Sequence, residues 1–117
     1  MTREKFEELA RRAVESLPEE FKLRLENVDI LVEDRPTVEQ RGRRGSEILG
    51  LYEGVPHTER GENYNLAMPD RITLFQKPIE AMCRSDEEIA TEIERTIIHE
   101  VAHHFGIDDR QLKKMGW

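Results

Sequence analysis

The sequence predicts an α+β fold of one domain, residues 1–117, in which a small mixed or antiparallel sheet of three to four strands packs on helices. Three observations support this prediction. A chain of 117 residues can bury one modest hydrophobic core but not two large lobes. Two long segments repeat apolar residues every three or four positions, as amphipathic helices do. Between them, three short apolar segments alternate with stretches of Pro, Gly and polar residues, as strands and loops do.

The N-terminal segment predicts an amphipathic helix of about four turns. Pro18 ends this helix, because proline lacks an amide hydrogen and does not fit a helix interior. A short amphipathic segment follows at residues 21–25. The apolar face of the helix comprises Phe6, Leu9, Ala10, Ala13, Val14 and Leu17.

Three short segments have the composition of strands, and they are residues 28–32, 48–52 and 71–75. The third could lie at an edge of the sheet or in its interior. Residues 35–47 and 54–65 predict loops, since both contain Pro, Gly and many polar residues. The first loop carries a basic cluster in an acidic protein, which is either a binding surface or a solvated loop. This cluster comprises Arg41, Arg43 and Arg44.

The longest helix is predicted over residues 85–104. Ser85 and Glu88 have the spacing of a capping box, which marks the first turn of a helix. Gly106 follows as its C-terminal cap, because glycine readily adopts positive φ. A short helix is predicted after it, over residues 108–115. The buried stripe of the long helix comprises Ile89, Ile93, Ile97 and Val101.

Charge and cysteine content exclude several classes of protein. Eighteen basic and 25 acidic residues give a net charge of −7, which argues against a nucleic-acid partner. No segment approaches the roughly 20 apolar residues of a membrane span, and the charged N-terminal residues do not resemble a secretory signal. One cysteine, Cys83, cannot form an intramolecular disulfide and is typical of a reducing compartment. We therefore expect a cytoplasmic protein without a nucleic-acid or membrane partner, in which Cys83 is a small apolar core residue.

The long helix contains an HExxH motif, from His99 to His103. Residues i and i+4 share one helical face, so two imidazoles can bind one metal ion. Glu100 lies one position further round, where its carboxylate can take a proton from a metal-bound water without binding the metal. Two solvated histidines on a surface helix are the alternative, but the capped helix and the separate isoleucine stripe favour a metal site.

The motif extends to HExxHxxGxxD, which provides a third ligand. Gly106 can turn the chain sharply, and the turn would bring Asp109 back to the two imidazoles. Two nitrogens and one carboxylate oxygen suit Zn²⁺ and leave a fourth position open for water. Asp108 could bind instead, although the spacing favours Asp109 and Asp108 is typical of a helix N-cap.

The extended motif resembles that of the metzincin branch of zinc peptidases, with Asp109 where the third histidine usually stands. The whole chain is similar to the small bacterial zincin-like metallopeptidases. This resemblance implies a minimal zincin-like fold, in which a small sheet packs on the active-site helix and an N-terminal helix. The matching segments are residues 50–56, 58–61, 69–75 and 94–109.

The resemblance also implies a zinc metallopeptidase that cleaves a peptide or protein substrate held along an edge strand. In that reading His99, His103 and Asp109 are the zinc ligands and Glu100 is the general base. Larger metzincins carry a methionine turn beneath the metal. Met115 is the only methionine after the motif, and the resemblance assigns it no role.

Other side chains near the motif have two interpretations each. His104 either supports a ligand or packs against a neighbour, and Arg95 either pairs with a carboxylate near the site or lies on the surface. A tyrosine or histidine from the middle of the chain could stabilise the oxyanion of a hydrated carbonyl, or could simply be solvated. The candidates are Tyr52, His57 and Tyr64.

Two other functions stay open at this stage. A small bacterial family of metal-dependent endoribonucleases also carries HxxxH with a nearby third ligand, but Glu100 and the acidic charge argue against it. A non-catalytic binding module stabilised by zinc is the second alternative. It predicts a metal site closed to water and loss of folding when the metal is chelated.

Overall fold

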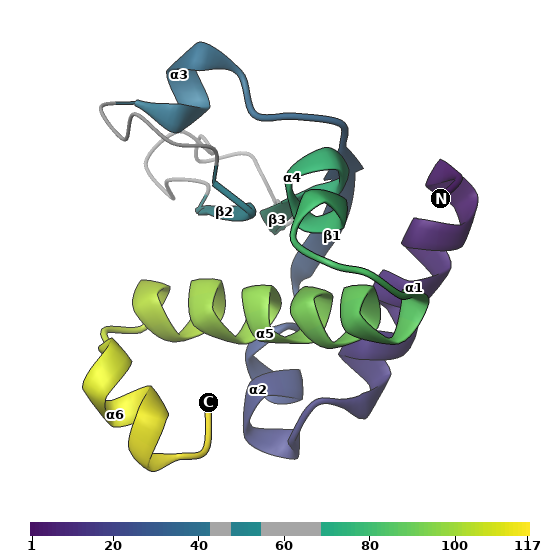
Figure 1. Cartoon of the computed structure of the whole chain (residues 1–117). Helices are drawn as coiled ribbons and strands as arrows, with labels where there is room; N and C mark the ends of the chain where they lie inside the picture. The colour runs from purple at the N-terminus through teal and green to yellow at the C-terminus, as the bar shows by residue number, and fades with distance from the viewer. Residues whose placement is uncertain (43–47, 55–68) are drawn as a thin grey trace.

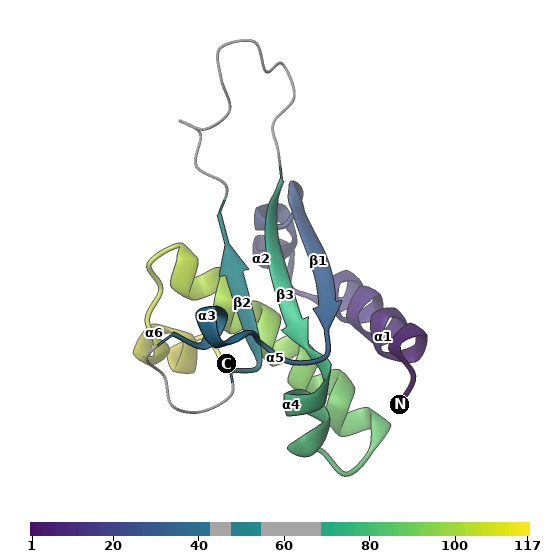
Figure 2. The same cartoon turned by 90° about the horizontal axis from the view of Figure 1, so that it is seen from above.

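The computed structural model describes residues 1–42, 48–54 and 69–117, and arranges them as a small sheet with helices across one face (Figures 1 and 2). The element order differs from the predicted order by three additional short helices. The elements are α1 (Arg3–Ser16), α2 (Glu19–Arg24), β1 (Val28–Glu33), α3 (Val38–Arg41), β2 (Gly50–Glu53), β3 (Asp70–Phe75), α4 (Gln76–Ala81), α5 (Asp86–His104) and α6 (Asp109–Lys114).

β3 is the central strand of a three-stranded sheet with the order β1-β3-β2. β1 pairs with β3 in parallel, and β2 pairs with β3 antiparallel, so Ile72 lies between Ile30 and Tyr52. The α+β class with a small mixed sheet is therefore confirmed. An edge position for residues 71–75 is wrong, because both sides of β3 are hydrogen-bonded. The parallel pair needs a long connection between its strands, and β2 lies within that connection.

The core lies between the sheet and the helices α1 and α5. Alternate residues of β1 and β3 face the helices, because successive side chains of a strand point to opposite sides. The two predicted apolar helix faces meet there, and each fully buried isoleucine or phenylalanine contributes about 1.5–3 kcal/mol. The most buried core side chains are Phe6, Phe21, Ile72, Leu74, Ile79, Ile93, Ile97, Ile98, Val101 and Leu112. Cys83 packs against this core half-buried, and burial raises the pKa of its thiol.

Side-chain caps begin the two long helices, and the one at Ser85 was predicted. The hydroxyl of Ser85 accepts the amide of Glu88 at 3.1 Å, which begins α5 as expected. The reciprocal half of the capping box is absent there, because the Glu88 carboxylate accepts the amide of Arg84 instead. Thr2 caps α1 in the same way, through the amide of Lys5 at 3.1 Å.

Two short helices occupy segments that the sequence predicted as a loop and as the end of a strand. In α3, Thr37 and Gln40 form a complete capping box, which gives a single turn inside the polar segment 35–47. α4 begins directly after β3 and contains Pro78 in its first turn. Proline is tolerated there because the amides of the first turn have no partner within the helix.

α5 is the longest helix and has 19 residues. Acidic residues in its first turn and histidines in its last turn complement the helix dipole. Within the described residues, no helix combines the length and apolarity needed to cross a membrane. A cytoplasmic location stays a prediction.

Gly50 allows the edge strand β2 to lie directly on α5. A Cβ atom at this position would stand 2.7 Å from the methyl of Thr96 and 3.2 Å from the carbonyl oxygen of Thr73. Thr96 lies one turn before the HExxH motif, so this close approach sets the distance between β2 and the motif.

Replacing Gly50 with alanine should therefore destabilise the fold by about 1–3 kcal/mol through overpacking. Urea unfolding monitored by circular dichroism measures the change. Thr96→Ser removes the methyl that the new Cβ meets, so it should restore part of the lost stability in the double variant. An unchanged unfolding midpoint in Gly50→Ala would show that the strand and the helix are not in close contact.

Candidate metal centre

α5 places His99 and His103 one turn apart on its exposed side, away from the buried isoleucines. Their side chains are 31% and 46% exposed, whereas Val101 and Ala102 between them are fully buried. The same helical period that buries one face thus presents two imidazoles to solvent on the other.

A glycine turn ends α5 and reverses the chain. Gly106 has φ 81°, and its amide donates to the carbonyl of His103 at 3.1 Å. The amide of Ile107 donates to the carbonyl of Ala102 at 2.8 Å, which completes a Schellman motif. The side chain of Ile107 packs against the core. The direction of the reversed chain is therefore fixed by this packing and by the two main-chain hydrogen bonds.

The two aspartates after the turn have separate roles. Asp108 caps α6, since its carboxylate accepts the amide of Gln111 at 2.8 Å and the Gln111 side chain accepts the amide of Asp108 at 3.0 Å. Asp109, the first residue of α6, places its Oδ1 atom 2.7 Å from Nε2 of His103 and 3.8 Å from Nδ1 of His99. The N-cap prediction for Asp108 is confirmed.

The three predicted ligands come together, with their donor atoms within 4.8 Å of one another. Two imidazole nitrogens and one carboxylate oxygen form a donor set that suits Zn²⁺ and falls one ligand short of its usual four. Binding of the ion by these residues stays a prediction, and the geometry meets its main requirement.

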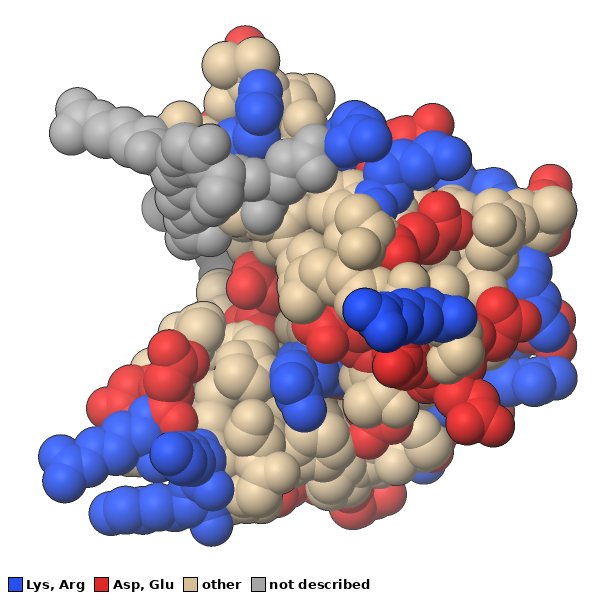
Figure 3. Space-filling model, viewed as in Figure 1, with Lys and Arg blue, Asp and Glu red and all other residues tan. Residues whose placement is uncertain are grey.

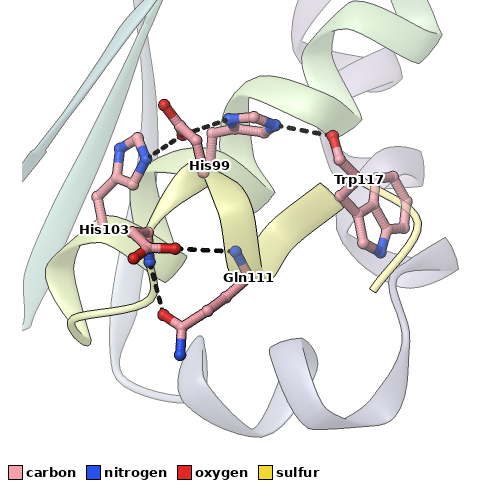
Figure 4. A network of polar contacts seen from close by, with 6 residues as sticks. His99, His103, Gln111 and Trp117 are labelled. Atoms are coloured by element: carbon pink, nitrogen blue, oxygen red, sulfur yellow. Dashed lines mark hydrogen bonds and ion pairs between the residues drawn. The ribbon is translucent and has the colours of Figure 1, made fainter. Parts of the chain in front are cut away.

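The main chain of Trp117 orients His99, as Figure 4 shows. Nε2 of His99 lies 3.2 Å from the main-chain oxygen of Trp117. The main-chain oxygen only accepts hydrogen bonds, so Nε2 donates in this contact, while Nδ1 lies on the side of Asp109. A second glycine turn, Gly116 with φ 95°, brings Trp117 back to this position. Sequence reasoning missed this contact, and the Gly-Trp dipeptide after α6 was the only available signal.

The carboxylate of Glu100 is held by the edge strand. Its Oε1 atom accepts the main-chain amide of Tyr52 in β2 at 3.0 Å. Gly50 of β2, the two residues before it and one side of α5 line a cavity of about 300 Å³ that includes two of the predicted ligands. In Figure 3, which has the same view as Figure 1, acidic and basic side chains are spread over the described part of this face. The lining residues are Ile48, Leu49, Gly50, Glu92, Arg95, Thr96, His99, Glu100 and His103.

The remaining candidates divide between packing and surface positions. Tyr52 is not placed as an oxyanion donor, because its hydroxyl donates to the carboxylate of Asp70 at 2.8 Å. His104 stacks on the Tyr52 ring, which matches its expected packing role. Arg95 is exposed at the rim of the cavity, without an ion pair to any described residue. His57 and Tyr64, together with Arg43 and Arg44, lie outside the described residues.

Two further predictions concern residues at helix ends. Arg41 is the last residue of α3, and its neighbours in the basic cluster are not described, so the function of the cluster stays open. Met115 follows α6 and is 42% exposed, which is unlike a methionine buried beneath a metal.

The fold and this site define a small α+β protein with an HExxH motif and a candidate metal site, and comparison with known proteins gives the family. The model of the zincin-like metallopeptidases matches residues 25–117. The chain therefore belongs to the zincin-like metallopeptidase family. A solved structure of a conserved hypothetical protein from Thermo thermophilus is similar, with a TM-score of 0.58 and 29% identity over 89% of this chain and 94% of that one. No curated protein is similar enough to count as a match.

Asp109 and its neighbour provide a matched pair of variants. Asp109→Ala should lower the affinity for Zn²⁺ by more than about 100-fold, since it removes one of three ligands. Asp108→Ala should leave zinc affinity within about twofold and cost about 1 kcal/mol of stability through the lost cap. Competition against a chromophoric chelator measures the first effect, and urea unfolding measures the second. Equal zinc affinity in Asp109→Ala and the wild type would remove Asp109 from the ligand set.

Proposed function

We propose that this protein is a zinc-dependent peptidase that hydrolyses peptide bonds in peptide or protein substrates. One observation carries the proposal. The Glu100 carboxylate accepts an amide of the edge strand, and Glu100 lines a cavity together with His99 and His103, two of the three predicted ligands. A general base, a metal site and a surface for an extended chain are the three parts that metal-assisted hydrolysis of a peptide requires.

In this proposal His99, His103 and Asp109 hold Zn²⁺ by two nitrogens and one oxygen. The bound ion would supply a Lewis acid that polarises a carbonyl and lowers the pKa of a water to about 7. The ligands reach it from α5 and from the start of α6, and both elements are anchored to the core by buried apolar side chains. Rigid support of this kind keeps ligand positions constant.

Glu100 would act as the general base. One of its oxygens, Oε1, already accepts the amide of Tyr52, which fixes the plane of the carboxylate. The other, Oε2, can then take the proton of an attacking water and deliver it to the nitrogen of the leaving amine. Glu100 is half-buried, so the carboxylate is partly shielded from bulk water.

β2 would bind the substrate as an added strand. It lies at the edge of the sheet, and the amide of Tyr52 points away from β3 toward Glu100. Backbone groups alternate in direction along a strand, so the main-chain groups of Gly50 also point away from β3, on the side of the cavity. The substrate edge in this proposal is β2, because β3, for which the sequence left an edge position open, is the central strand.

Glu100→Gln should keep the zinc affinity and lower hydrolysis by at least about 100-fold, because the amide cannot accept the proton. A library of unstructured peptides followed by mass spectrometry provides the assay when the natural substrate is unknown. Metal content, measured on the same samples, is the control. Equal cleavage by Glu100→Gln and the wild type would exclude Glu100 as the base.

Removal of zinc distinguishes a catalytic from a structural metal site. The three ligands lie on the exposed side of the core, so chelation should abolish hydrolysis while the far-ultraviolet circular dichroism stays native. Unfolding on chelation would instead support a zinc-stabilised binding module. Cleavage of single-stranded RNA by the wild type but not by His99→Ala would support the nuclease alternative.

A further inference from the structure

Tyr52 connects the edge strand to the catalytic site through its main chain. The register of β2 on β3 explains the direction of this contact. The amide of Phe75 donates to the carbonyl of Leu49, so the pair Leu51 and Thr73 is hydrogen-bonded while Tyr52 and Ile72 are not. The amide of Tyr52 therefore faces away from β3, and the Oε1 atom of Glu100 accepts it at 3.0 Å.

The side chain of Tyr52 is held from two other elements. Its hydroxyl donates to Oδ2 of Asp70, at the start of β3, at 2.8 Å. Its ring stacks on His104, the last residue of α5, with ring centroids 3.9 Å apart and planes inclined by 20°. The strand that carries the amide is thus fastened to both the sheet and the active-site helix.

The surroundings of Tyr52 keep its hydroxyl protonated and its neighbours in close contact. Burial, with help from Asp70, raises the pKa of Tyr52 to about 12, so the hydroxyl remains a donor at neutral pH. At Gly54 the chain passes close to His104 and Asp70, the two side chains that contact Tyr52. A Cβ there would lie 3.4 Å from the His104 ring and 3.7 Å from the Asp70 carboxylate.

We propose that Tyr52 is a positioning residue, whose clamped side chain keeps its main-chain amide on the Glu100 carboxylate. β2 has only four residues, and among the described residues it pairs with β3 alone, so without a clamp its end would open readily. A glutamate side chain has three rotatable bonds and loses its orientation when its partner leaves. The clamp itself needs neither metal nor substrate, while its effect on catalysis rests on the proposed peptidase function.

Amide hydrogen exchange measured by NMR on the metal-free protein tests the clamp directly. Tyr52→Phe removes only the hydroxyl and His104→Ala removes the stacked ring, so each should speed exchange at residue 52 about fivefold or more. His104→Phe keeps a stacked ring and should leave exchange within about twofold of the wild type. The amide of Leu51, which faces β3, is the internal control.

Glu100→Ala should speed exchange at residue 52 in the same way, because it removes the acceptor. Unchanged exchange at residue 52 in Tyr52→Phe and His104→Ala would overturn the proposal. An equal increase at Leu51 would overturn it as well, since it would indicate general loosening of β2.

Kinetics on the zinc-loaded protein test the consequence. In Tyr52→Phe we expect kcat to fall about tenfold with KM and zinc affinity within about twofold, since the substrate edge and the ligands are intact. His104→Phe should keep the wild-type kcat. A rise in KM without a change in kcat would contradict the positioning role. If the wild type itself cleaves no peptide, the peptidase proposal fails, and the exchange experiment still decides the clamp.

Discussion

The predicted metal site depends on the reversal of the chain at Gly106. A positive φ of 81° closes the Schellman motif at the end of α5, and the next residues run back along the helix. Without this reversal Asp109 would follow the helix axis away from the imidazoles. With it, the carboxylate reaches 2.7 Å from His103. A β-carbon at this position would strain the backbone in every case, which is why the turn needs glycine.

A second constraint joins the site to the sheet. The close approach at Gly50 lets β2 lie on α5 one turn before the motif, and the amide of Tyr52 then meets Glu100. The carboxylate of Glu100, the proposed general base, is therefore supported by a strand that is remote in sequence. The three predicted ligands, in contrast, come from one short continuous segment. The predicted metal site and the proposed base thus depend on different parts of the fold, and a substitution can disturb one without the other.

Most of the secondary structure follows from local patterns, and the exceptions have local causes. The long helix was predicted over residues 85–104 and lies at Asp86–His104, because its cap and its apolar period agree. α3 was missed because a helix of one turn is too short to show an apolar period. The spacing of Thr37 and Gln40, which form its capping box, was the available signal. The sequence left residues 71–75 open between an edge and an interior strand, because strand order depends on pairing between segments distant in sequence, which a local pattern does not contain.

The sequence by itself determined the α+β class, the HExxHxxGxxD motif and the N-cap at Asp108, because spacing along one helix and one turn decides them. Only the tertiary structure decided which strand lies at the edge and which atoms hold Glu100 and His99. Those partners, Tyr52 and Trp117, act through main-chain atoms. Nearly every residue carries the same main-chain amide and carbonyl groups, so a contact through them does not require a particular residue type. Such contacts are therefore visible only in the folded structure.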